Sequence, residues 1–217
     1  MKKFELTNEF ITNMFGTKLF RIRALVEFGD VEAGELGGYV EKESNLGHDD
    51  NAWVYDNAWV YGNARVYGDA QVSGDARVYG NARVCGDALV CGNALVYDNA
   101  WVYGNARVCG DALVCGNARV CSDALVCGNA RVCSDEDYAY AHGFGSVNRT
   151  TTFFRLKDGG VGVRCGCFYG TLAQFRDKIR ETHGETKKAQ EYLMLADLME
   201  LRFEEDENEV GNRKYVE

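Results

Sequence analysis

The nine cysteines and three histidines offer the most varied chemistry in this chain, so their spacing is considered first. Seven of the cysteines directly follow a valine at one position of a six-residue repeat, as in Val-Cys-Gly-Asp. A small secreted protein uses its cysteines as a framework of cross-links, whereas these recur with the repeat. This regularity favours thiols that fill a repeat position, and we expect them to be reduced. The seven are Cys85, Cys91, Cys109, Cys115, Cys121, Cys127 and Cys133.

The remaining candidates for catalysis or metal binding are sparse. Cys165 and Cys167 have no second cysteine pair near them, and one side of a strand explains their spacing better than a zinc site. His48, His142 and His183 all lie outside the repeat. The chain contains no P-loop and no His-Glu-x-x-His motif. The sequence therefore predicts no catalytic residue, no metal site and no cofactor.

Charge and hydropathy narrow the class of partner. The net charge of −9 argues against sequence-independent binding to nucleic acid, which depends on lysine and arginine to neutralise phosphates. No stretch approaches the ~20 apolar residues of a membrane span, and the N-terminus lacks the apolar run of a secretory signal. We expect a soluble cytoplasmic protein that binds neither a membrane nor nucleic acid.

The element that must position these residues is the repeat, which runs from Asn51 to Ser134. Valine occupies the same position fourteen times, from Val54 to Val132, and alanine stands two residues before each valine. Ala-x-Val alternates as a strand does, so alanine and valine point inward and the residue between them points outward. Glycine followed by asparagine or aspartate suits a corner that needs positive φ. Each hexad is thus one short strand and one turn.

The Ala-x-Val spacing resembles that of the hexapeptide-repeat family, whose members form left-handed parallel β-helices with three hexads per coil. The flanking Leu36–Leu46 and Arg164–Leu172 segments extend the resemblance to a group of hexapeptide-repeat proteins of bacteria and their phages. The resemblance implies a mainly β fold and a bacterial host cell. Its best-known members are acyltransferases, in which a histidine acts as general base and acyl-CoA lies between subunits.

Three hexads per coil would stack residues 18 apart and sort the outward residues into three faces. The first, here called the Arg/Trp face, displays Arg65, Arg83, Trp101 and Arg119. The second displays Trp53, Gln71, Leu89, Arg107 and Leu125, and the third Trp59, Arg77, Leu95, Leu113 and Arg131. Arginine offers bidentate donors and tryptophan a stacking plane, so the first face is a candidate site for an anionic partner. The alternative is a solvated surface on which tryptophan stacks with the arginine stems.

Apolar residues at outward positions suggest a second surface. Neighbouring leucines would merge into a patch, and exposed apolar patches usually mark an interface. We therefore predict a homo-oligomer, a dimer or trimer, formed through the β-helix wall. The leucines concerned are Leu89, Leu95, Leu113 and Leu125.

The corners of the coil sort into columns in the same way. Asn63, Asn81, Asn99 and Asn117 would line one edge and form an amide ladder. Asp69, Asp87, Asn105 and Asp123 would line another, where the carboxylates repel one another and Asn105 interrupts them. Cys91, Cys109 and Cys127 would stack along one corner and Cys115 and Cys133 along another, at a spacing that a disulfide could bridge under oxidation.

The segments on either side of the repeat predict smaller units. Residues 1–50 read as strands that cap the first coil of the β-helix at 51–140, and a two-residue slip lies at 48–50. Residues 150–204 predict a ββαα module: a hairpin at Thr151–Leu156 and Val161–Cys167, then helices that begin at Thr171 and Thr186. Residues 205–217 form an acidic tail.

Three functions are compatible with this sequence. The first is a non-enzymatic protein-binding rod that acts through a β-helix face and a C-terminal module, which either dimerises or docks a partner. The phage-associated resemblance makes a phage-encoded inhibitor of a host defence protein its concrete form. The second is a CoA-dependent acyltransferase of the hexapeptide class. The third is a structural rod that self-associates end to end. The absence of any histidine within the repeat favours the first.

Overall fold

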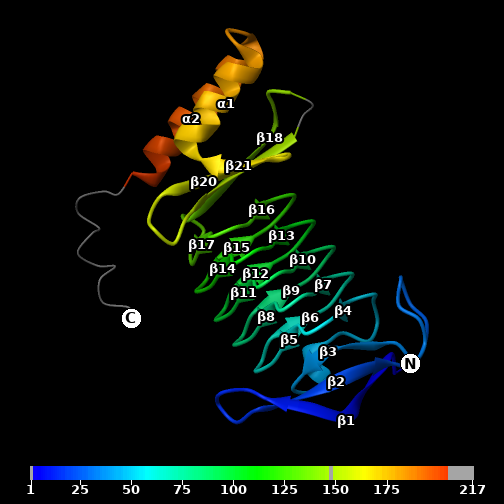
Figure 1. Cartoon of the computed structure of the whole chain (residues 1–217). Coiled ribbons are helices and arrows are strands. Elements are labelled where there is room, and N and C mark those ends of the chain that lie inside the picture. Colours follow the sequence, from blue (N-terminus) through cyan, green and yellow to red (C-terminus); the bar gives the residue numbers. More distant parts are fainter. Residues whose placement is uncertain (1, 147–148, 205–217) are drawn as a thin grey trace.

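The computed structural model describes residues 2–146 and 149–204 of the 217-residue chain. The predicted acidic tail, residues 205–217, lies outside the described residues. Figure 1 shows an N-terminal group of strands, a rod of stacked coils, and a C-terminal sheet with two helices. No helix in the described ranges is long and apolar enough to cross a membrane.

The repeat forms fourteen short strands, each made of the outward residue and the valine that follows it. Each pairs in parallel with the strand 18 residues away, so Leu89 lies beside Arg107 and Val90 beside Val108. A parallel β-helix with three hexads per coil is therefore confirmed, whereas its left-handed sense stays a prediction. The strands are β4 (Trp53–Val54), β5 (Trp59–Val60), β6 (Arg65–Val66), β7 (Gln71–Val72), β8 (Arg77–Val78), β9 (Arg83–Val84), β10 (Leu89–Val90), β11 (Leu95–Val96), β12 (Trp101–Val102), β13 (Arg107–Val108), β14 (Leu113–Val114), β15 (Arg119–Val120), β16 (Leu125–Val126) and β17 (Arg131–Val132).

Alanine and valine fill the interior of the coil. Every repeat alanine from Ala52 to Ala130 and every repeat valine from Val54 to Val132 is 0% exposed. Burying one valine side chain contributes about 1.5 kcal/mol or more, so the rod is stabilised by many equal increments. Most corners use glycine in the left-handed region, such as Gly62 at φ 69°, while Asp56, Asp98 and Ser122 adopt the same conformation.

The N-terminal strands extend one of the three sheets. β1 (Phe4–Thr12), β2 (Lys18–Ala24) and β3 (Leu36–Val40) pair antiparallel, and β3 then pairs in parallel with β5. Val40 pairs with Val60 and Leu46 with Val66, which separates the partners by 20 residues rather than 18. The two extra residues correspond to the slip predicted at 48–50. A 3-10 helix, η1 (Glu43–Asn45), completes this first coil.

The prediction that Trp53 is displayed outward is wrong, because the N-terminal segment covers it. Its side chain is 0% exposed, with the Phe4 and Phe28 rings 6.2 and 5.3 Å from its own ring. A Cβ on Gly37 would lie 2.8 Å from Trp53 Cζ2, so only glycine allows this approach. The second face is therefore closed at its first strand.

The C-terminal module has four strands rather than the two predicted. β18 (Tyr138–Phe144), β19 (Arg149–Arg155), β20 (Val161–Cys165) and β21 (Phe168–Thr171) form an antiparallel sheet in chain order. The alternating start of β18 looks in sequence like the end of the repeat. Gly166, at φ 59°, and Cys167 form the turn between β20 and β21, so the expectation that Cys165 and Cys167 share one strand is wrong.

Two helices cover this sheet: α1 (Leu172–His183) and α2 (Lys187–Phe203). The predicted capping box at the start of α1 is confirmed, since Thr171 Oγ1 accepts from Gln174 N–H and Gln174 Oε1 accepts from Thr171 N–H. Leu172, Phe175 and Ile179 are buried, as the sequence predicts. The aromatic side chains of Phe153, Phe175 and Tyr192 link the sheet to both helices.

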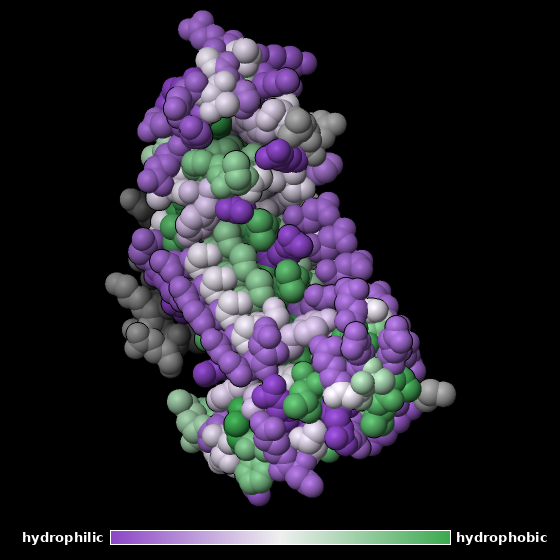
Figure 2. All heavy atoms as spheres, turned by 45° about the vertical axis from the view of Figure 1, so that its right-hand side comes forward, coloured by the Kyte–Doolittle hydropathy of each residue, from purple (hydrophilic) through white to green (hydrophobic). Residues whose placement is uncertain are grey.

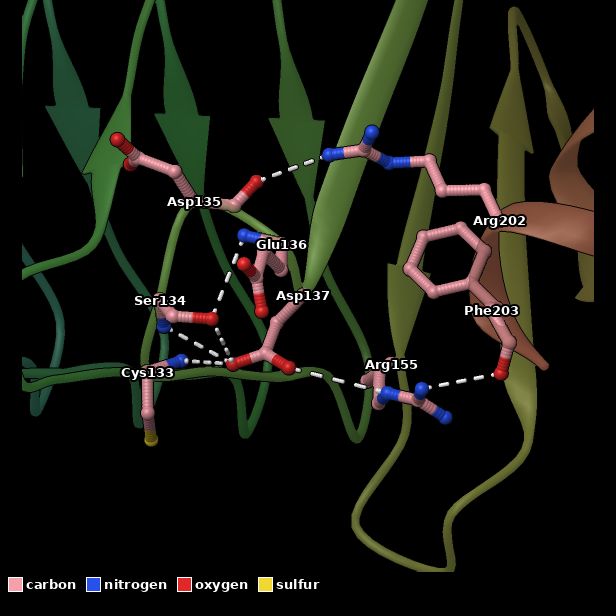
Figure 3. A network of polar contacts seen from close by, with 8 residues as sticks. All are labelled: Cys133, Ser134, Asp135, Glu136, Asp137, Arg155, Arg202 and Phe203. Atoms are coloured by element: carbon pink, nitrogen blue, oxygen red, sulfur yellow. Dashed lines mark hydrogen bonds and ion pairs between the residues drawn. The ribbon is translucent and has the colours of Figure 1, made fainter. Parts of the chain in front are cut away.

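The module is joined to the last coil by a polar network (Figure 3). Asp137 accepts from the backbone N–H groups of Cys133 and Ser134, both at 2.9 Å. Arg155 from β19 approaches Asp137 and also donates to the carbonyl of Phe203 at the end of α2. Beside this network, Leu125 N–H donates to Thr152 Oγ1. The last coil is thus closed by the sheet.

Candidate binding surface

The Arg/Trp face is a continuous ladder on one side of the rod. Strands β6, β9, β12 and β15 place Arg65 beside Arg83, Arg83 beside Trp101, and Trp101 beside Arg119. The three arginines are exposed and Trp101 is half-buried. Neighbouring coils lie about 4.8 Å apart, so the face spans about 14 Å from Arg65 to Arg119. The predicted stacking of these four residues is confirmed.

The guanidinium groups of this face form no ion pair with a carboxylate in the described part of the chain, although the Asp135 carboxylate accepts from the Arg119 backbone N–H at 2.7 Å. Every ion pair there involves other residues, although the protein carries a net charge of −9. The Arg65 guanidinium lies 6.0 Å from the Tyr67 ring, which is a weak contact. Like charges on neighbouring strands repel one another, so an anion placed across the ladder would be stabilised.

Trp101 contributes less to this surface than its sequence position suggests. Its Nε1 donates to Cys85 Sγ at 3.2 Å, and its ring lies 4.9 Å from the ring of Tyr103. The indole is therefore directed along the coil toward the next corner. On the third face, by contrast, the Arg77 guanidinium lies 4.3 Å over the Trp59 ring, which is the arginine–tryptophan stacking considered as the alternative for the first face.

An amide ladder borders the Arg/Trp face at the start of its strands. Asn63 donates to Asn81, Asn81 to Asn99 and Asn99 to Asn117, at 3.3, 3.1 and 3.2 Å. The predicted ladder is thus confirmed, and its hydrogen bonds link neighbouring coils along this edge. Figure 2 shows the same ordering on one side of the molecule, where side chains of similar hydropathy line up in columns along the rod.

The four predicted interface leucines lie on two faces, as the 18-residue spacing predicts. Leu89 and Leu125 lie on the second face with Arg107 between them, and Leu95 lies beside Leu113 on the third. All four are half-buried rather than exposed, because side chains on neighbouring coils cover one another. Leu95 and Leu113 are neighbours as expected, whereas the exposure of all four leucines is lower than the sequence suggested. Their role in oligomerisation stays a prediction.

A different apolar surface, not predicted from the sequence, lies on α2. Met194, Leu198 and Leu201 are 71%, 54% and 67% exposed, and their spacing of four and three residues places them on one side of the helix. The sequence prediction for α2 covered its buried stripe, which includes Ala189, Ala196 and Met199, and did not include this second stripe. The i, i+4, i+7 pattern was the available signal. We call these three residues the α2 stripe.

The three histidines do not lie together, and none of them belongs to the Arg/Trp face. His48 accepts a hydrogen bond from Lys3 N–H at its Nδ1 and stacks on the Phe4 ring at 4.5 Å. His142 Nδ1 lies 2.9 Å from Thr150 Oγ1. His183 stacks near Tyr192 and lines a hollow of about 200 Å³ with Cys165 and Cys167. Ligand pockets usually measure about 300 Å³ or more.

Metal ligands do not converge in the described ranges, where no group of three His, Cys, Asp or Glu side chains could hold an ion. The expectation of free thiols is wrong at one corner, since Cys115 and Cys133 form a disulfide across neighbouring coils. This corner also holds a ladder of tyrosines: Tyr61, Tyr79 and Tyr97 stack with centroids 5.0 Å apart. Burial, and then the neighbouring tyrosines, raise the pKa of Tyr79 to about 12.

Comparison with known proteins supports the repeat architecture. A family model described as the YdcK β-solenoid repeat matches in five overlapping segments, residues 58–74, 70–86, 76–91, 88–104 and 100–116. A search of the curated proteins finds no match to this chain. The matched segments run from β5 to β14 and thus lie within the rod. The chain is a repeat β-helix protein, similar over this part to the YdcK repeat.

Proposed function

We propose that this protein is a non-enzymatic protein-binding rod whose Arg/Trp face takes an acidic surface of a partner protein. The observation that carries the proposal is the ladder of three exposed arginines whose guanidinium groups form no ion pair within the described residues, in a chain with a net charge of −9. Isolated surface charges are common, but three in register along one rigid face present a fixed pattern of bidentate donors.

The shape of this face favours a macromolecular partner. The face is straight, spans about 14 Å and is held by the parallel strands beneath it, so it matches an extended acidic strand or helix. The most specific form of the proposal rests on the resemblance to hexapeptide-repeat proteins of bacteria and phages. In that form the protein is a phage-encoded inhibitor that occupies a host defence protein in the bacterial cytoplasm.

The experiment compares two doubly charge-reversed variants of the full chain. Arg83→Glu with Arg119→Glu changes the proposed face, whereas Arg107→Glu with Arg131→Glu makes the same charge change at outward positions of the other two faces. Each tagged variant is used to capture proteins from a bacterial lysate at two salt concentrations. A partner retained by wild type and by the control pair, and weakened at least about tenfold by the first pair, supports the proposal. Equal loss from both pairs contradicts it.

The acyltransferase alternative has its own test. Calorimetric titration with acetyl-CoA separates the two functions, because a binding rod gives no heat, whereas a hexapeptide-type enzyme binds the cofactor in the micromolar range. Binding heat that disappears in His142→Ala would overturn the non-enzymatic proposal. His142 is exposed and its Nδ1 bonds to Thr150 Oγ1 on the surface, so the substitution leaves the core intact.

Self-association is proposed to be a closed dimer through the α2 stripe. Two α2 helices packed antiparallel would cover Met194, Leu198 and Leu201 of each copy. They would also bring the Lys187 and Lys188 end of one copy against the Glu204 end of the other, so the charges attract. This arrangement replaces the leucine wall as the surface best supported by exposure.

Light scattering on a size-exclusion column tests the dimer with two matched variants. Leu198→Glu changes the α2 stripe, and Leu113→Glu changes the β-helix wall. A dimer that becomes a monomer only in Leu198→Glu supports the α2 interface. A monomeric wild type, or a dimer lost only in Leu113→Glu, contradicts it. A mass that grows with concentration would support the end-to-end rod.

A further inference from the structure

The corner that follows β10, β13 and β16 carries a column of three thiols. Val90, Val108 and Val126 are paired in register, and Cys91, Cys109 and Cys127 directly follow them. The backbone continues this alignment, since Cys91 N–H donates to the Val108 carbonyl and Cys109 N–H to that of Val126. Cys127 is buried, and the other two are half-buried.

An equivalent corner shows that this alignment permits a cross-link. Cys115 and Cys133 follow Val114 and Val132, are also 18 residues apart, and form a disulfide with their Cα atoms 4.3 Å apart. Neighbouring coils are separated by about 4.8 Å, within the range of Cα separations that disulfides span. The same repeat position in the next column therefore brings two thiols within bonding reach.

The charges of two arginines act on the middle thiol of the column. Arg107 on β13 is two residues before Cys109, and Arg164 on β20 of the C-terminal module lies near enough to favour its thiolate. The Nε of Arg164 is buried and has no hydrogen-bond partner among the described residues. A thiolate beside it would compensate this buried charge.

The thiols of Cys109 and Cys127 differ in pKa. A hydrogen bond from Cys127, together with the charges of Arg164 and Arg107 and against the effect of burial, lowers the pKa of Cys109 from 9.0 to about 7. The hydrogen bond to Cys109, and then burial, raise the pKa of Cys127. Burial also raises the pKa of Cys91. Of the two thiols, Cys109 is therefore the one that ionises more readily.

We propose that Cys109 is an oxidation-sensitive thiol that forms a second disulfide between coils, with Cys127 as its partner. A peroxide is the oxidant. The Cys109 thiolate attacks one peroxide oxygen, the O–O bond breaks, and hydroxide leaves, which gives a sulfenic acid on Cys109. This hydroxide takes the proton of Cys127 and becomes the first water. The Cys127 sulfur then attacks Cys109, the S–S bond forms, and the S–O bond breaks to release a second hydroxide, which takes up the proton that Cys109 lost on ionising and becomes the second water. Two thiols and one hydrogen peroxide thus give one disulfide and two waters.

This reaction distinguishes Cys109 from the other free thiols. Cys85 and Cys121 are separated by Tyr103 in their own column, so they have no thiol on a neighbouring coil. Cys165 accepts a hydrogen bond from Thr151 Oγ1, and Cys167 lies in an exposed turn. Among residues 2–146 and 149–204, the column of Cys91, Cys109 and Cys127 is the one that combines stacked thiols with two nearby guanidinium groups.

The test treats the purified full chain with hydrogen peroxide and maps the disulfides by mass spectrometry before and after. The expected result is a loss of two hydrogen masses and a new link between Cys109 and Cys127. Cys109→Ser abolishes the link, and Cys127→Ser leaves a sulfenic acid on Cys109 that a cyclic diketone traps. Cys85→Ser is the matched control and forms the link normally. A link between Cys91 and Cys109, or first oxidation at Cys167, overturns the proposal.

A second measurement needs no substitution in the column. The rate of alkylation of Cys109 in the wild-type chain, followed by peptide mapping across pH, should reach half its maximum near pH 7 rather than near 9. Arg164→Ala should move this midpoint upward, and Arg164→Lys should restore part of the shift. A midpoint near 9 in wild type overturns the proposal, whatever the stability of the serine variants.

Discussion

The carboxylate of Asp137 lies 3.8 Å from the guanidinium of Arg155, and both side chains are largely buried. The same carboxylate accepts from the backbone of Cys133 and Ser134, while Arg155 donates to the Phe203 carbonyl. One ion pair therefore connects the end of the last coil, the C-terminal sheet and the end of α2.

Asp137→Ala is predicted to destabilise the junction between the rod and the module. Two backbone N–H groups and a buried guanidinium lose their acceptor, which costs about 1–3 kcal/mol for each group left unpaired. Urea unfolding of the full chain measures this loss. Asp75→Ala is the control, because Asp75 is exposed and no hydrogen bond or ion pair of its carboxylate is found among the described residues. Equal effects of the two variants would contradict the role assigned to Asp137.

Trp53 and Trp59 stand in the same Ala-Trp-Val context but should differ strongly in their contribution to stability. Trp53→Ala empties a fully buried site between Phe4 and Phe28 and should cost about 3–5 kcal/mol. Trp59→Ala removes a half-buried ring and its contact with Arg77, which contributes about 1 kcal/mol. The free energies of unfolding of the two variants, measured side by side, check the difference; similar losses would contradict the burial of Trp53.

Substitutions in the asparagine and aspartate columns should change the stability of the protein in opposite directions. Asn81→Ala breaks two bonds of the amide ladder and should lower stability by about 1 kcal/mol, a modest loss because the ladder is exposed. Asp87→Asn should raise the midpoint of thermal unfolding, because it removes repulsion from Asp69 and gives an amide that can donate to Asn105. Thermal unfolding in low salt measures both, and a decrease with Asp87→Asn would show that the aspartate column does not repel itself.

Lys3 predicts a defined pH dependence of stability. Burial lowers its pKa from 10.5 to about 8, against the raising effect of Asp50 and Asp49. Between these values the unfolded chain holds a proton that the folded chain has lost, so the free energy of unfolding rises with pH across this window. Below about pH 8 both states are charged and the full cost of burial is present.

Lys3→Met isolates this effect. The stability of wild type relative to the variant should increase by at most about 3 kcal/mol from pH 8 to 10.5, because a pKa shift of one unit corresponds to about 1.4 kcal/mol. Tyrosines with raised pKa values, such as Tyr79, titrate in both proteins and cancel in the difference. Unfolding curves that stay parallel across this window would contradict the shifted pKa.

The sequence was sufficient to predict whatever the hexad determines by itself. The position of valine and alanine gave the core, the 18-residue spacing gave the ladder from Asn63 to Asn117, and the slip at 48–50 anticipated the 20-residue first coil. These features depend only on the period, which is visible in a single chain. The outward arginines could be placed on one face for the same reason.

Contacts between distant segments could not be predicted in this way. Trp53 is buried by Phe4 and Gly37, which the repeat does not contain, so its hexad looks like that of Trp59. β18 looked like the fading repeat because its first residues alternate as a hexad does, whereas its antiparallel partner β19 lies outside the repeat. The Cys115–Cys133 disulfide could not be predicted either, because Cys91, Cys109 and Cys127 have the same 18-residue spacing. Spacing alone does not show which neighbouring thiols are linked.

Each strand of the repeat pairs in parallel with the strand 18 residues away, which has a further consequence for evolution by insertion and deletion. Loss or gain of 18 residues would shorten or lengthen the rod and leave every column continuous. Loss of a single hexad would also preserve the core, but it would turn the C-terminal module by one third of a revolution about the long axis. The number of hexads therefore sets the side of the rod on which the α2 stripe lies relative to the arginine ladder.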